Sequence, residues 1–284
     1  EVIKKSIDLI QELIASCGAD IKKIKGIGLG ISGVISEDAG TIRDTDPKRG
    51  FTSGSFISIC SKIEEKFCIP TYLGNDATCA AFGEKRLAID EDIDNMLYMY
   101  SDMGLGIIIK GDIYCGAGGS AGEIQILCNT DEKSDIDEKS LYYLRPHGRD
   151  LGIANDAKDI IKTAANTKIL QFTGGDPQNI TLDIVIKAAE EGDKVAVSLI
   201  EKAGVTLGTR IAYLINLFNP EIVVIGGGVE KARELILGPI RKTVRRLAFE
   251  EPAGKVRIIA SLLGEDAVAL GAASLVLREI FISV

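Results

Sequence analysis

The sequence predicts an α/β protein with a mainly parallel sheet, because short apolar segments alternate along the chain with segments of helical periodicity. The glycine-spaced segment 24–31 and the apolar segments 222–225 and 256–260 have the length and composition of buried strands. Residues 95–114 differ, since they predict a strand and a hairpin that turns near Gly111. We therefore expect a mixed sheet.

The first third of the chain predicts alternating helices and strands. In order, we expect a helix that ends near Cys17-Gly18, the strand 24–31, a turn at Ser32-Gly33, a loop over 41–55, a helix face with Phe56, Ile59, Ile63 and Phe67, and a strand over 70–73. This strand runs into Gly74-Asn75-Asp76, and a helix through Ala80, Ala81 and Arg86 follows. In the strand, Ile27, Leu29 and Ile31 alternate with glycines. This leaves one face bare, which often marks the close approach of another backbone or a ligand.

The rest of the chain is mostly helical. After the hairpin we expect a Gly/Ala/Ser-rich loop over 116–122, a charged exposed loop over 129–139, a helix from Thr181 to Gly192, a longer helix over 193–218, the strand 222–225 with three glycines after it, the strand 256–260, and a final helix over 266–282.

The composition is that of a folded protein with a substantial core, since 46% of the 284 residues are hydrophobic and 26% are charged. The net charge of -8 argues against nucleic-acid binding by this chain itself, because DNA affinity rests mainly on Lys and Arg. No apolar segment approaches the roughly 20 residues that cross a bilayer. The cysteines at 17, 60, 68, 79, 115 and 128 are scattered, which predicts reduced and mostly buried thiols in a cytoplasmic protein.

The chain begins with Glu1, not Met, and its first residues already have helical periodicity, with Ile3, Ile7, Ile10 and Ile14 at helical spacing. We therefore expect that further elements precede this sequence. If the protein acts on DNA, we expect the DNA-binding part among them.

Asp76, in Gly74-Asn75-Asp76, is the first candidate for chemistry. A carboxylate where a strand ends at the edge of a sheet can act as a general base and accept a hydroxyl proton during phosphoryl transfer. The alternative is that Asp76 is the N-cap of the following helix. Spacing alone favours the cap.

Two glycine-rich segments could present backbone N–H groups to phosphate. Gly104 and Gly106 lie in a hairpin, but the nearby Asp102 would repel phosphate, so a tight turn is the favoured interpretation. Gly226–Gly228 lie between a strand and a helix, an arrangement typical of nucleotide loops. They do not match the dinucleotide fingerprint, so the signal is weak alone, and the alternative is a tight strand-to-helix turn.

Glu123 follows the small-residue loop Gly118–Gly122. Small residues allow close approach of a ligand, and a carboxylate accepts hydrogen bonds from sugar hydroxyls. A flexible loop is an equal alternative. The single histidine, His147, has no metal-ligand cluster near it in the sequence, so we expect it to be structural or exposed.

The order and spacing of these motifs resemble the ROK family of repressors and sugar kinases. The resembling segments are Gly26–Val34, Leu73–Glu84, Gly118–Ile124, Asn216–Gly228 and Ala267–Ala273, which span nearly the whole chain. The most telling is the Asn-Asp-Ala helix start at Asn75.

The resemblance implies an actin-like, ribonuclease-H-like fold with two lobes, a sugar cleft, and homodimers, possibly tetramers, formed mainly through the second lobe. Residues 1–94 would belong to the first lobe, 95–265 to the second lobe with its dimerisation helices, and 266–284 to a closing helix that packs back toward the first lobe. The sugar-binding residues that it implies are Ser32, Gly33, Asn75, Asp76 and Glu123. In kinase members the residue that matches Asp76 is the catalytic base. Remnants of the nucleotide loops would be Gly104, Gly106, Gly226, Gly227 and Gly228.

Three departures from the family pattern bear on function. The usual Gly-Thr-Gly phosphate loop is Asp102-Met103-Gly104 here, which adds a negative charge where phosphates would lie. The usual Gly-His, a sugar contact and zinc ligand, is Gln125-Ile126, and Cys128 has no other cysteine at ligand spacing. We therefore predict no zinc and no metal site.

These observations favour the effector-binding and dimerisation body of a sugar-responsive transcriptional repressor, with DNA bound only through a winged helix that precedes this chain. No cofactor and no membrane contact are expected. The alternative is an ATP-dependent sugar kinase, with Asp76 as base and Mg-ATP at the glycine loops. A homologue with neither activity is a third possibility. The sugar itself is not identified, since xylose, glucose and N-acetylglucosamine are all known in the family.

Overall fold

The computed structural model describes residues 2–18, 20–33, 35–36, 39–43, 56–101, 104–124, 150–162 and 167–282. The chain forms two compact units. The first comprises 1–90, 113–121 and 266–284, and the second comprises 91–112 and 122–265.

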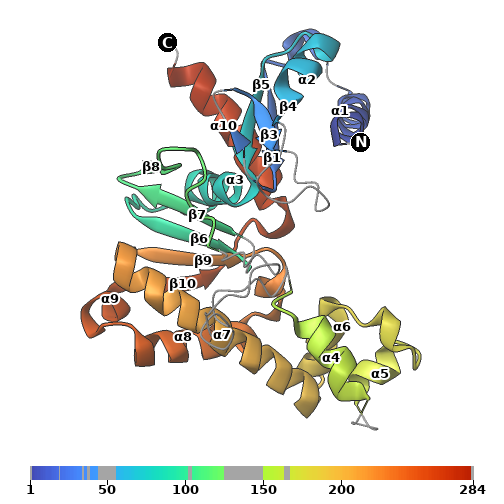
Figure 1. Cartoon of the computed structure of the whole chain (residues 1–284), viewed down its shortest axis with the longest axis vertical. Helices are drawn as coiled ribbons and strands as arrows, with labels where there is room; N and C mark the ends of the chain where they lie inside the picture. The colour runs from blue at the N-terminus through green and yellow to red at the C-terminus, as the bar shows by residue number, and fades with distance from the viewer. Residues whose placement is uncertain are drawn as a thin grey trace, which may run out of the picture. The chain divides into compact units, whose positions relative to one another are not determined.

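The first unit contains two small sheets and the helices around them (Figure 1). Its elements are α1 (Val2–Cys17), η1 (Ile21–Lys23), β1 (Ile27–Ile31), β2 (Ile35–Ser36), β3 (Thr41–Arg43), β4 (Phe56–Ser58), α2 (Ile59–Phe67), β5 (Thr71–Asn75), α3 (Asp76–Gly83), the π-helical η2 (Glu84–Ala88) and α10 (Ala267–Ile282). Strands β1 and β5 are parallel, with Ile27 opposite Thr71 and Ile31 opposite Asn75. Strands β2, β3 and β4 form an antiparallel sheet.

Two sequence predictions were wrong in this unit. The predicted loop 41–55 begins with strand β3, and Phe56 lies in strand β4 rather than on a helix, so α2 begins only at Ile59. The reason is a long-range pairing in which Arg43 lies opposite Phe56. Local periodicity does not report such a pairing, because the two segments meet only in the folded chain.

The bare face of β1 packs against α10, as the alternating glycines predicted. A Cβ atom on Gly28 would lie 2.2 Å from the carbonyl oxygen of Ala272, and one on Gly30 would lie 2.4 Å from Cγ1 of Val268. Helix α10 also lies directly against α3, since a Cβ on Gly271 would lie 1.8 Å from the carbonyl oxygen of Cys79. Close backbone contact therefore holds α3 and β1 to the same helix.

The core of this unit is rich in isoleucine. Its buried members are Ile27, Ile35, Ile42, Ile59, Cys60, Ile63, Ile69 and Leu73. Helix α1 packs against them through the partly buried Ile3, Ile7 and Ile10. This is the helical spacing that the sequence shows at its start.

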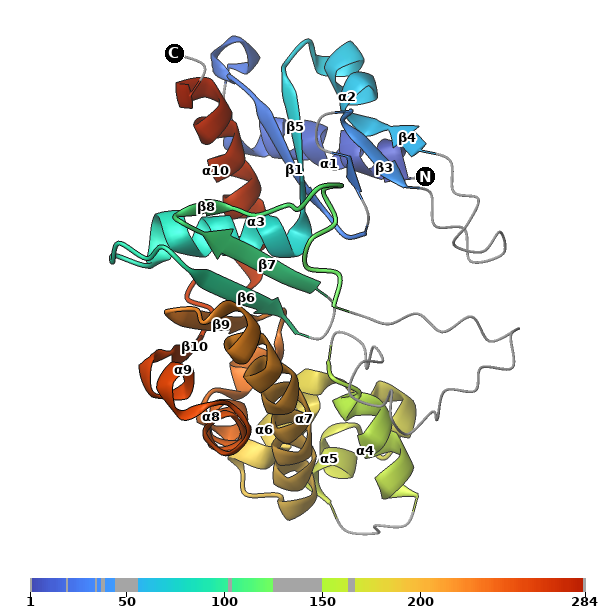
Figure 2. The ribbon, with the colours of Figure 1, turned by 60° about the vertical axis from the view of Figure 1, so that its left-hand side comes forward.

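The second unit contains a five-stranded mixed sheet and the remaining helices (Figure 2). Its elements are β6 (Met96–Tyr100), β7 (Gly104–Ile109), β8 (Asp112–Ile113), α4 (Ile153–Ile161), α5 (Lys168–Phe172), η4 (Pro177–Asn179), α6 (Leu182–Glu190), α7 (Lys194–Phe218), β9 (Ile222–Gly226), η5 (Val229–Ala232), α8 (Glu234–Leu247), α9 (Glu250–Lys255), β10 (Arg257–Ala260) and η6 (Gly264–Asp266), with β8 and η6 at its boundary. The strand order is β10-β9-β6-β7-β8. Strand β9 is parallel to β6 and β10, and β6 is antiparallel to β7, so the mixed α/β sheet is confirmed.

Helices α7 and α8 lie side by side because two glycines of α7 face α8. A Cβ atom on Gly204 would lie 3.0 Å from the carbonyl oxygen of Ile236, and one on Gly208 would lie 3.0 Å from that of Ile240. The small residues allow the two backbones to approach closely, which stabilises the pair through many van der Waals contacts.

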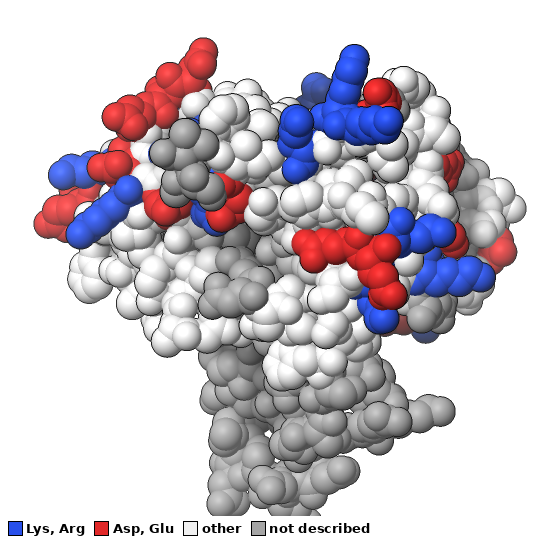
Figure 3. Space-filling view, turned by 90° about the horizontal axis from the view of Figure 1, so that it is seen from above, with Lys and Arg blue, Asp and Glu red and all other residues white. Residues whose placement is uncertain are grey.

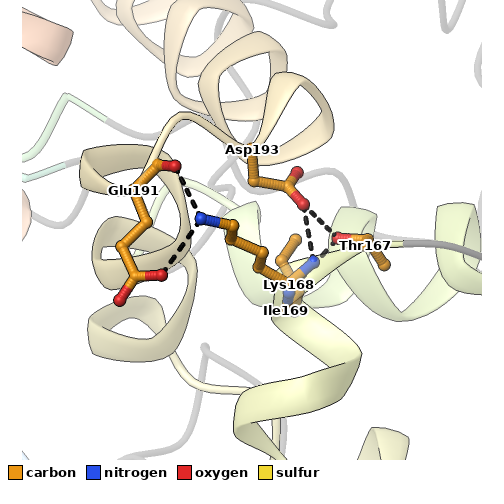
Figure 4. Close-up of polar contacts among 5 residues, drawn as sticks. All are labelled: Thr167, Lys168, Ile169, Glu191 and Asp193. Carbon is orange, nitrogen blue, oxygen red and sulfur yellow. Dashed lines mark hydrogen bonds and ion pairs between the residues drawn. The ribbon is translucent and has the colours of Figure 1, made fainter.

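The start of α7 is anchored by the carboxylate of Asp193 (Figure 4). Its Oδ2 accepts hydrogen bonds from the Thr167 hydroxyl (2.8 Å) and the Lys168 backbone N–H (2.7 Å), and its Oδ1 accepts one from the Ala196 N–H (2.9 Å). Burial, the largest single influence, would raise the pKa of Asp193, but these hydrogen bonds together outweigh it and lower the pKa. The carboxylate therefore joins α5 to α7.

None of the described helices is both long and apolar enough to cross a membrane.

Candidate functional site

The junction between β5 and α3 holds the first candidate residues. Asn75 is the N-cap of α3, since its Oδ1 accepts hydrogen bonds from the N–H groups of Ala77 (3.0 Å) and Thr78 (3.3 Å). The sequence interpretation that Asp76 is the cap was therefore wrong, because Asp76 is already the first residue of the helix. Its Oδ1 accepts a hydrogen bond from the Ala77 N–H at 2.8 Å.

The end of β1 lies beside this junction, because β1 and β5 are parallel neighbours and end at the same edge. The Ser32 hydroxyl donates a hydrogen bond to Oδ2 of Asp76, and the Asn75 amide donates one to the carbonyl oxygen of Gly33 at 3.3 Å. Gly33 has a φ of 102°, and a Cβ added there would meet no atom within 4 Å, so the turn needs glycine for its backbone and not for space.

Four of the five predicted sugar-binding residues thus lie together in the first unit. We call Ser32, Gly33, Asn75 and Asp76 the β1–β5 edge cluster. Ser32 and Gly33 are exposed, and Asn75 and Asp76 are half-buried. The cluster combines a carboxylate, a hydroxyl and an amide, which are the groups that exchange hydrogen bonds with sugar hydroxyls. That these residues bind a sugar stays a prediction.

Glu123, the fifth predicted residue, belongs to the second unit and is exposed. It follows Gly122, whose carbonyl oxygen accepts a hydrogen bond from the Leu105 N–H at 3.0 Å. A Cβ on Gly122 would lie 1.9 Å from the Leu105 carbonyl oxygen. The backbone that approaches this glycine is therefore strand β7 of the chain itself, and a contact of Glu123 with sugar stays a prediction.

The predicted nucleotide loops lie in the second unit. Gly104 and Gly106 are in strand β7, opposite Tyr100 and Tyr98 of β6. Asp102 and Met103, on which the altered phosphate loop rests, lie outside the described residues. The strands on either side of the predicted turn form an antiparallel pair, and the turn itself stays a prediction.

The Gly226–Gly228 turn follows the buried strand β9. A Cβ on Gly226 would lie 1.9 Å from the hydroxyl of Tyr98, and Gly227 and Gly228 have φ values of 87° and 112°. Ser101 is bonded to this turn, because its N–H and its hydroxyl both donate to the Gly226 carbonyl oxygen, at 2.8 and 3.0 Å. Packing therefore accounts for Gly226 and Gly227, and a positive φ accounts for Gly227 and Gly228.

A cavity of about 470 Å³ adjoins this turn within the second unit. Gly227 and Gly228 line it, together with the ammonium of Lys231. Three carboxylates also line it, those of Asp150, Asp183 and Glu265. The Lys231 ammonium forms ion pairs with Glu265 (2.5 Å) and Asp183 (3.4 Å). The side-chain hydrogen bond to Glu265 is the largest of the influences that raise the pKa of Lys231.

The sequence analysis missed Glu230, which lies beneath the turn. Its Oε2 accepts a hydrogen bond from the Gly228 N–H at 2.6 Å, and the residue is only 6% exposed. Burial raises the pKa of Glu230. A carboxylate two residues after three glycines was the available signal, because such a side chain can fold back onto the turn that precedes it.

The described cysteines are less buried than predicted. Cys60 and Cys79 are buried, but Cys17 and Cys68 are exposed. Burial, helped by the nearby Glu64 charge, raises the pKa of Cys60 to about 11. The exposed pair lies at helix ends, where Cys68 has a left-handed backbone.

The zinc prediction concerns Gln125, Ile126, Cys128 and His147, all of which lie outside the described residues. Among the residues that the structure does describe, no three His, Cys, Asp or Glu side chains are grouped as metal ligands. The absence of zinc stays a prediction.

The view in Figure 3 shows one charged face of the molecule. On this face Lys and Arg occur in small groups, with Asp, Glu and uncharged residues between them. Among the described residues of this face, no continuous basic surface of the kind that binds phosphate backbones is visible.

Comparisons with known proteins agree with this geometry. The family model described as "ROK family" matches residues 1–279. The xylose repressor of Caldicellulosiruptor bescii is 27% identical over 98% of this chain and 69% of its own length, and the glucokinase of Halalkalibacterium halodurans is 31% identical over 89% and 76%. The structure of a ROK family glucokinase from Streptomyces griseus, in complex with glucose and AMPPNP, superposes with a TM-score of 0.80, at 26% identity over 97% of this chain and 88% of that one. The chain therefore belongs to the ROK family and has its actin-like α/β fold.

Proposed function

We propose that this chain is the sugar-sensing and dimerising body of a ROK-family transcriptional repressor. The observation that carries the proposal is a contrast between two candidate sites. The β1–β5 edge cluster has polar groups in place for sugar hydroxyls, whereas the segment that resembles a phosphate loop has Asp102 where the family has a small neutral residue. The similarity to xylose repressors supports the same proposal.

In this proposal the sugar exchanges hydrogen bonds with Asp76 and Asn75, and Glu123 is a further carboxylate that accepts from its hydroxyls. The sugar stabilises the conformation that it binds. That is how a small molecule controls DNA binding, because it changes function only if it binds one conformation more tightly than another. The DNA-binding part lies outside this chain, and a repressor of this kind acts in the cytoplasm.

A second copy of the chain is the partner that we propose for the exposed face of α7. Val205, Tyr213 and Leu217 lie on one side of this helix and are exposed, with Tyr213 at 65%. Phe249, at 72% exposed, lies near the C-terminal end of α7, where its N–H donates to Oδ1 of Asn216 at 2.9 Å. Clustered large apolar side chains on a surface are typical of protein interfaces.

A sugar kinase is the second candidate, because Asp76 accepts a hydrogen bond from Ser32 and is placed at a strand end where a base can act. The 31% identity to a glucokinase supports it. In that case Asp76 removes the proton of a sugar hydroxyl, and Mg-ATP is the phosphoryl donor.

The two candidates are separated by measuring melting temperatures with a panel of sugars, with and without Mg-ATP, together with ADP release. A repressor body is expected to melt higher with one sugar, since a ligand of the folded state stabilises it, and to release no ADP. Sugar-dependent ADP release would establish the kinase. Asp76→Asn should abolish the sugar shift, and Asp8→Asn, the same change on the exposed face of α1, should leave it intact.

A further inference from the structure

We propose that the Glu230 carboxylate occupies the position at the Gly226–Gly228 turn where a phosphate would accept a hydrogen bond. In this way it keeps phosphate groups out of the adjoining cavity. The inference deepens the proposed function and rests on it, because a body that cannot accept a nucleotide here senses its sugar without phosphorylating it.

The first observation is the contact at the turn. A backbone N–H has a single hydrogen, and that of Gly228 already points at the Glu230 carboxylate, 2.6 Å away. Hydrogen bonds from N–H groups to charged carboxylates are short and strong. A phosphate oxygen could take this donor only after Glu230 had left, and Glu230 is buried, so it is not free to swing into solvent at little cost.

The second observation is that the lysine of the cavity already forms ion pairs. Among the described residues that line the cavity, Lys231 is the one cation, and its ammonium is paired with Asp183 and Glu265. A phosphate would have to compete with both carboxylates for it. Such competition is unfavourable, because the incoming group has the same charge sign as the groups that it must displace.

The third observation concerns Asp150, another wall of the same cavity. Its Oδ1 accepts a hydrogen bond from the Gly152 N–H at 3.1 Å, and its Oδ2 accepts one from the Ala154 N–H at 2.9 Å. These bonds hold the carboxylate at the start of α4. In the part of the walls that the structure describes, three carboxylates therefore stand against one ammonium.

A nucleoside triphosphate does not fit this donor set. Phosphates bind where backbone N–H groups and cations are available to them. Here the Gly228 N–H is bonded to Glu230, and Lys231 is bonded to two carboxylates. Burial also raises the pKa of Glu230, so protonation, which removes the charge that repels an anion, begins at a higher pH than for an exposed glutamate.

The test follows the amide signal of Gly228 by NMR while inorganic pyrophosphate is added to the protein. In the wild type we expect the signal to stay in place. In Glu230→Ala we expect it to move, with a dissociation constant at least about tenfold lower than in the wild type, since one charge-assisted hydrogen bond is released to the ligand. Glu230→Gln keeps the size of the side chain and removes its charge, so we expect an intermediate affinity.

Glu201→Ala is the matched control, because it makes the same change at an exposed residue of α7 that does not line the cavity, and it leaves the Glu230–Gly228 bond and the Lys231 ion pairs intact. We expect its Gly228 signal to stay in place. Melting curves and the sugar-induced shift show whether each variant is folded.

Three results would overturn the inference. They are a wild-type Gly228 signal that moves as far as that of Glu230→Ala, a folded Glu230→Ala variant whose signal does not move, and a Glu201→Ala variant that behaves like Glu230→Ala. The proposed function is judged separately, by sugar-dependent ADP release from the wild type. A protein that binds sugar and releases no ADP keeps the proposed function even if Glu230→Ala fails to bind pyrophosphate.

Discussion

The β1–β5 edge cluster and the Gly226–Gly228 turn both follow parallel strands, but they differ in whether their polar groups are accessible to a ligand. At the edge cluster, Ser32 and Gly33 are exposed and Asp76 is half-buried, so solvent or a ligand can reach them. At the turn, the Gly228 N–H is bonded to a buried carboxylate of the same chain. A glycine-rich turn after a strand is therefore insufficient to define a ligand site, because a neighbouring side chain can satisfy its donors.

The two regions also rest on different supports. The edge cluster rests on β1 and α3, which are packed backbone to backbone against α10. The cavity beside the turn rests on α4 and α6, which lie against α7, and α7 begins at the buried carboxylate of Asp193. The first support depends on the absence of side chains and the second on hydrogen bonds. Mutations should separate them.

The largest effect is expected for Gly28→Ala, which breaks the support of the edge cluster. The new methyl group would lie 2.2 Å from a backbone oxygen of α10, which cannot move aside like the end of a side chain. We expect a loss of about 3 kcal/mol in the free energy of unfolding, measured in urea. Gly118→Ala, with no atom within 4 Å, is the control and should change little. Equal losses in the two variants would contradict the packing argument.

The next effect is expected for Asp193→Ala, which breaks the support of the second unit. It removes the N-cap of α7 and an acceptor of three hydrogen bonds, so we expect a loss of about 2 kcal/mol at neutral pH. Because the pKa of Asp193 is lowered by folding, its contribution is present above the ordinary value of 3.8 and is lost as the pH falls through the folded value. The two proteins should therefore converge in acid, as followed by thermal melts across pH.

Lys168→Met is the control for that region. It removes an ion pair with Glu191 whose side chains are 40% and 47% exposed, so we expect less than about 0.5 kcal/mol. A loss as large as that of Asp193→Ala would show that the ion pair, and not the buried carboxylate, supports α7.

A smaller effect is expected for Ser32→Ala, which sharpens the comparison at the edge cluster. The change removes the hydroxyl that donates to Asp76 and leaves that carboxylate partly exposed to water. We expect sugar affinity to fall by about 1 kcal/mol, roughly fivefold, with the stability unchanged within about 0.5 kcal/mol. Calorimetry with the sugar found by the melting screen measures it, and an unchanged affinity would remove Ser32 from the site.

The smallest effect is expected for Glu230→Gln in its pH dependence. Because burial raises the folded pKa of Glu230, its contribution to stability is full below the ordinary value of 4.5 and is lost as the pH rises through the folded value. Glutamine does not titrate. The stability of the variant relative to the wild type should therefore increase as the pH rises above 4.5, and a decrease over that range would be inconsistent with a raised pKa.

The sequence by itself determined the family, the mixed α/β class, the strand before Asn75-Asp76 and the bare face of β1. Each of these is carried by a local pattern, such as alternating glycines or a strand followed by Asn-Asp-Ala, and local patterns survive without knowledge of distant contacts. The helix boundaries at Cys17, Thr181 and Phe218 came from the same kind of signal.

Only the tertiary structure decided three contacts. They are the pairing of Arg43 with Phe56, the hydrogen bond from Ser32 to Asp76 across 44 positions, and the hydrogen bond from the Gly228 N–H to Glu230. The first two join segments that are far apart in sequence, so no local period reports them. The third is local but depends on burial, since the same carboxylate in solvent would not be held against the turn. Whether a polar group is available to a ligand is thus a property of the folded surroundings, and composition alone does not show it.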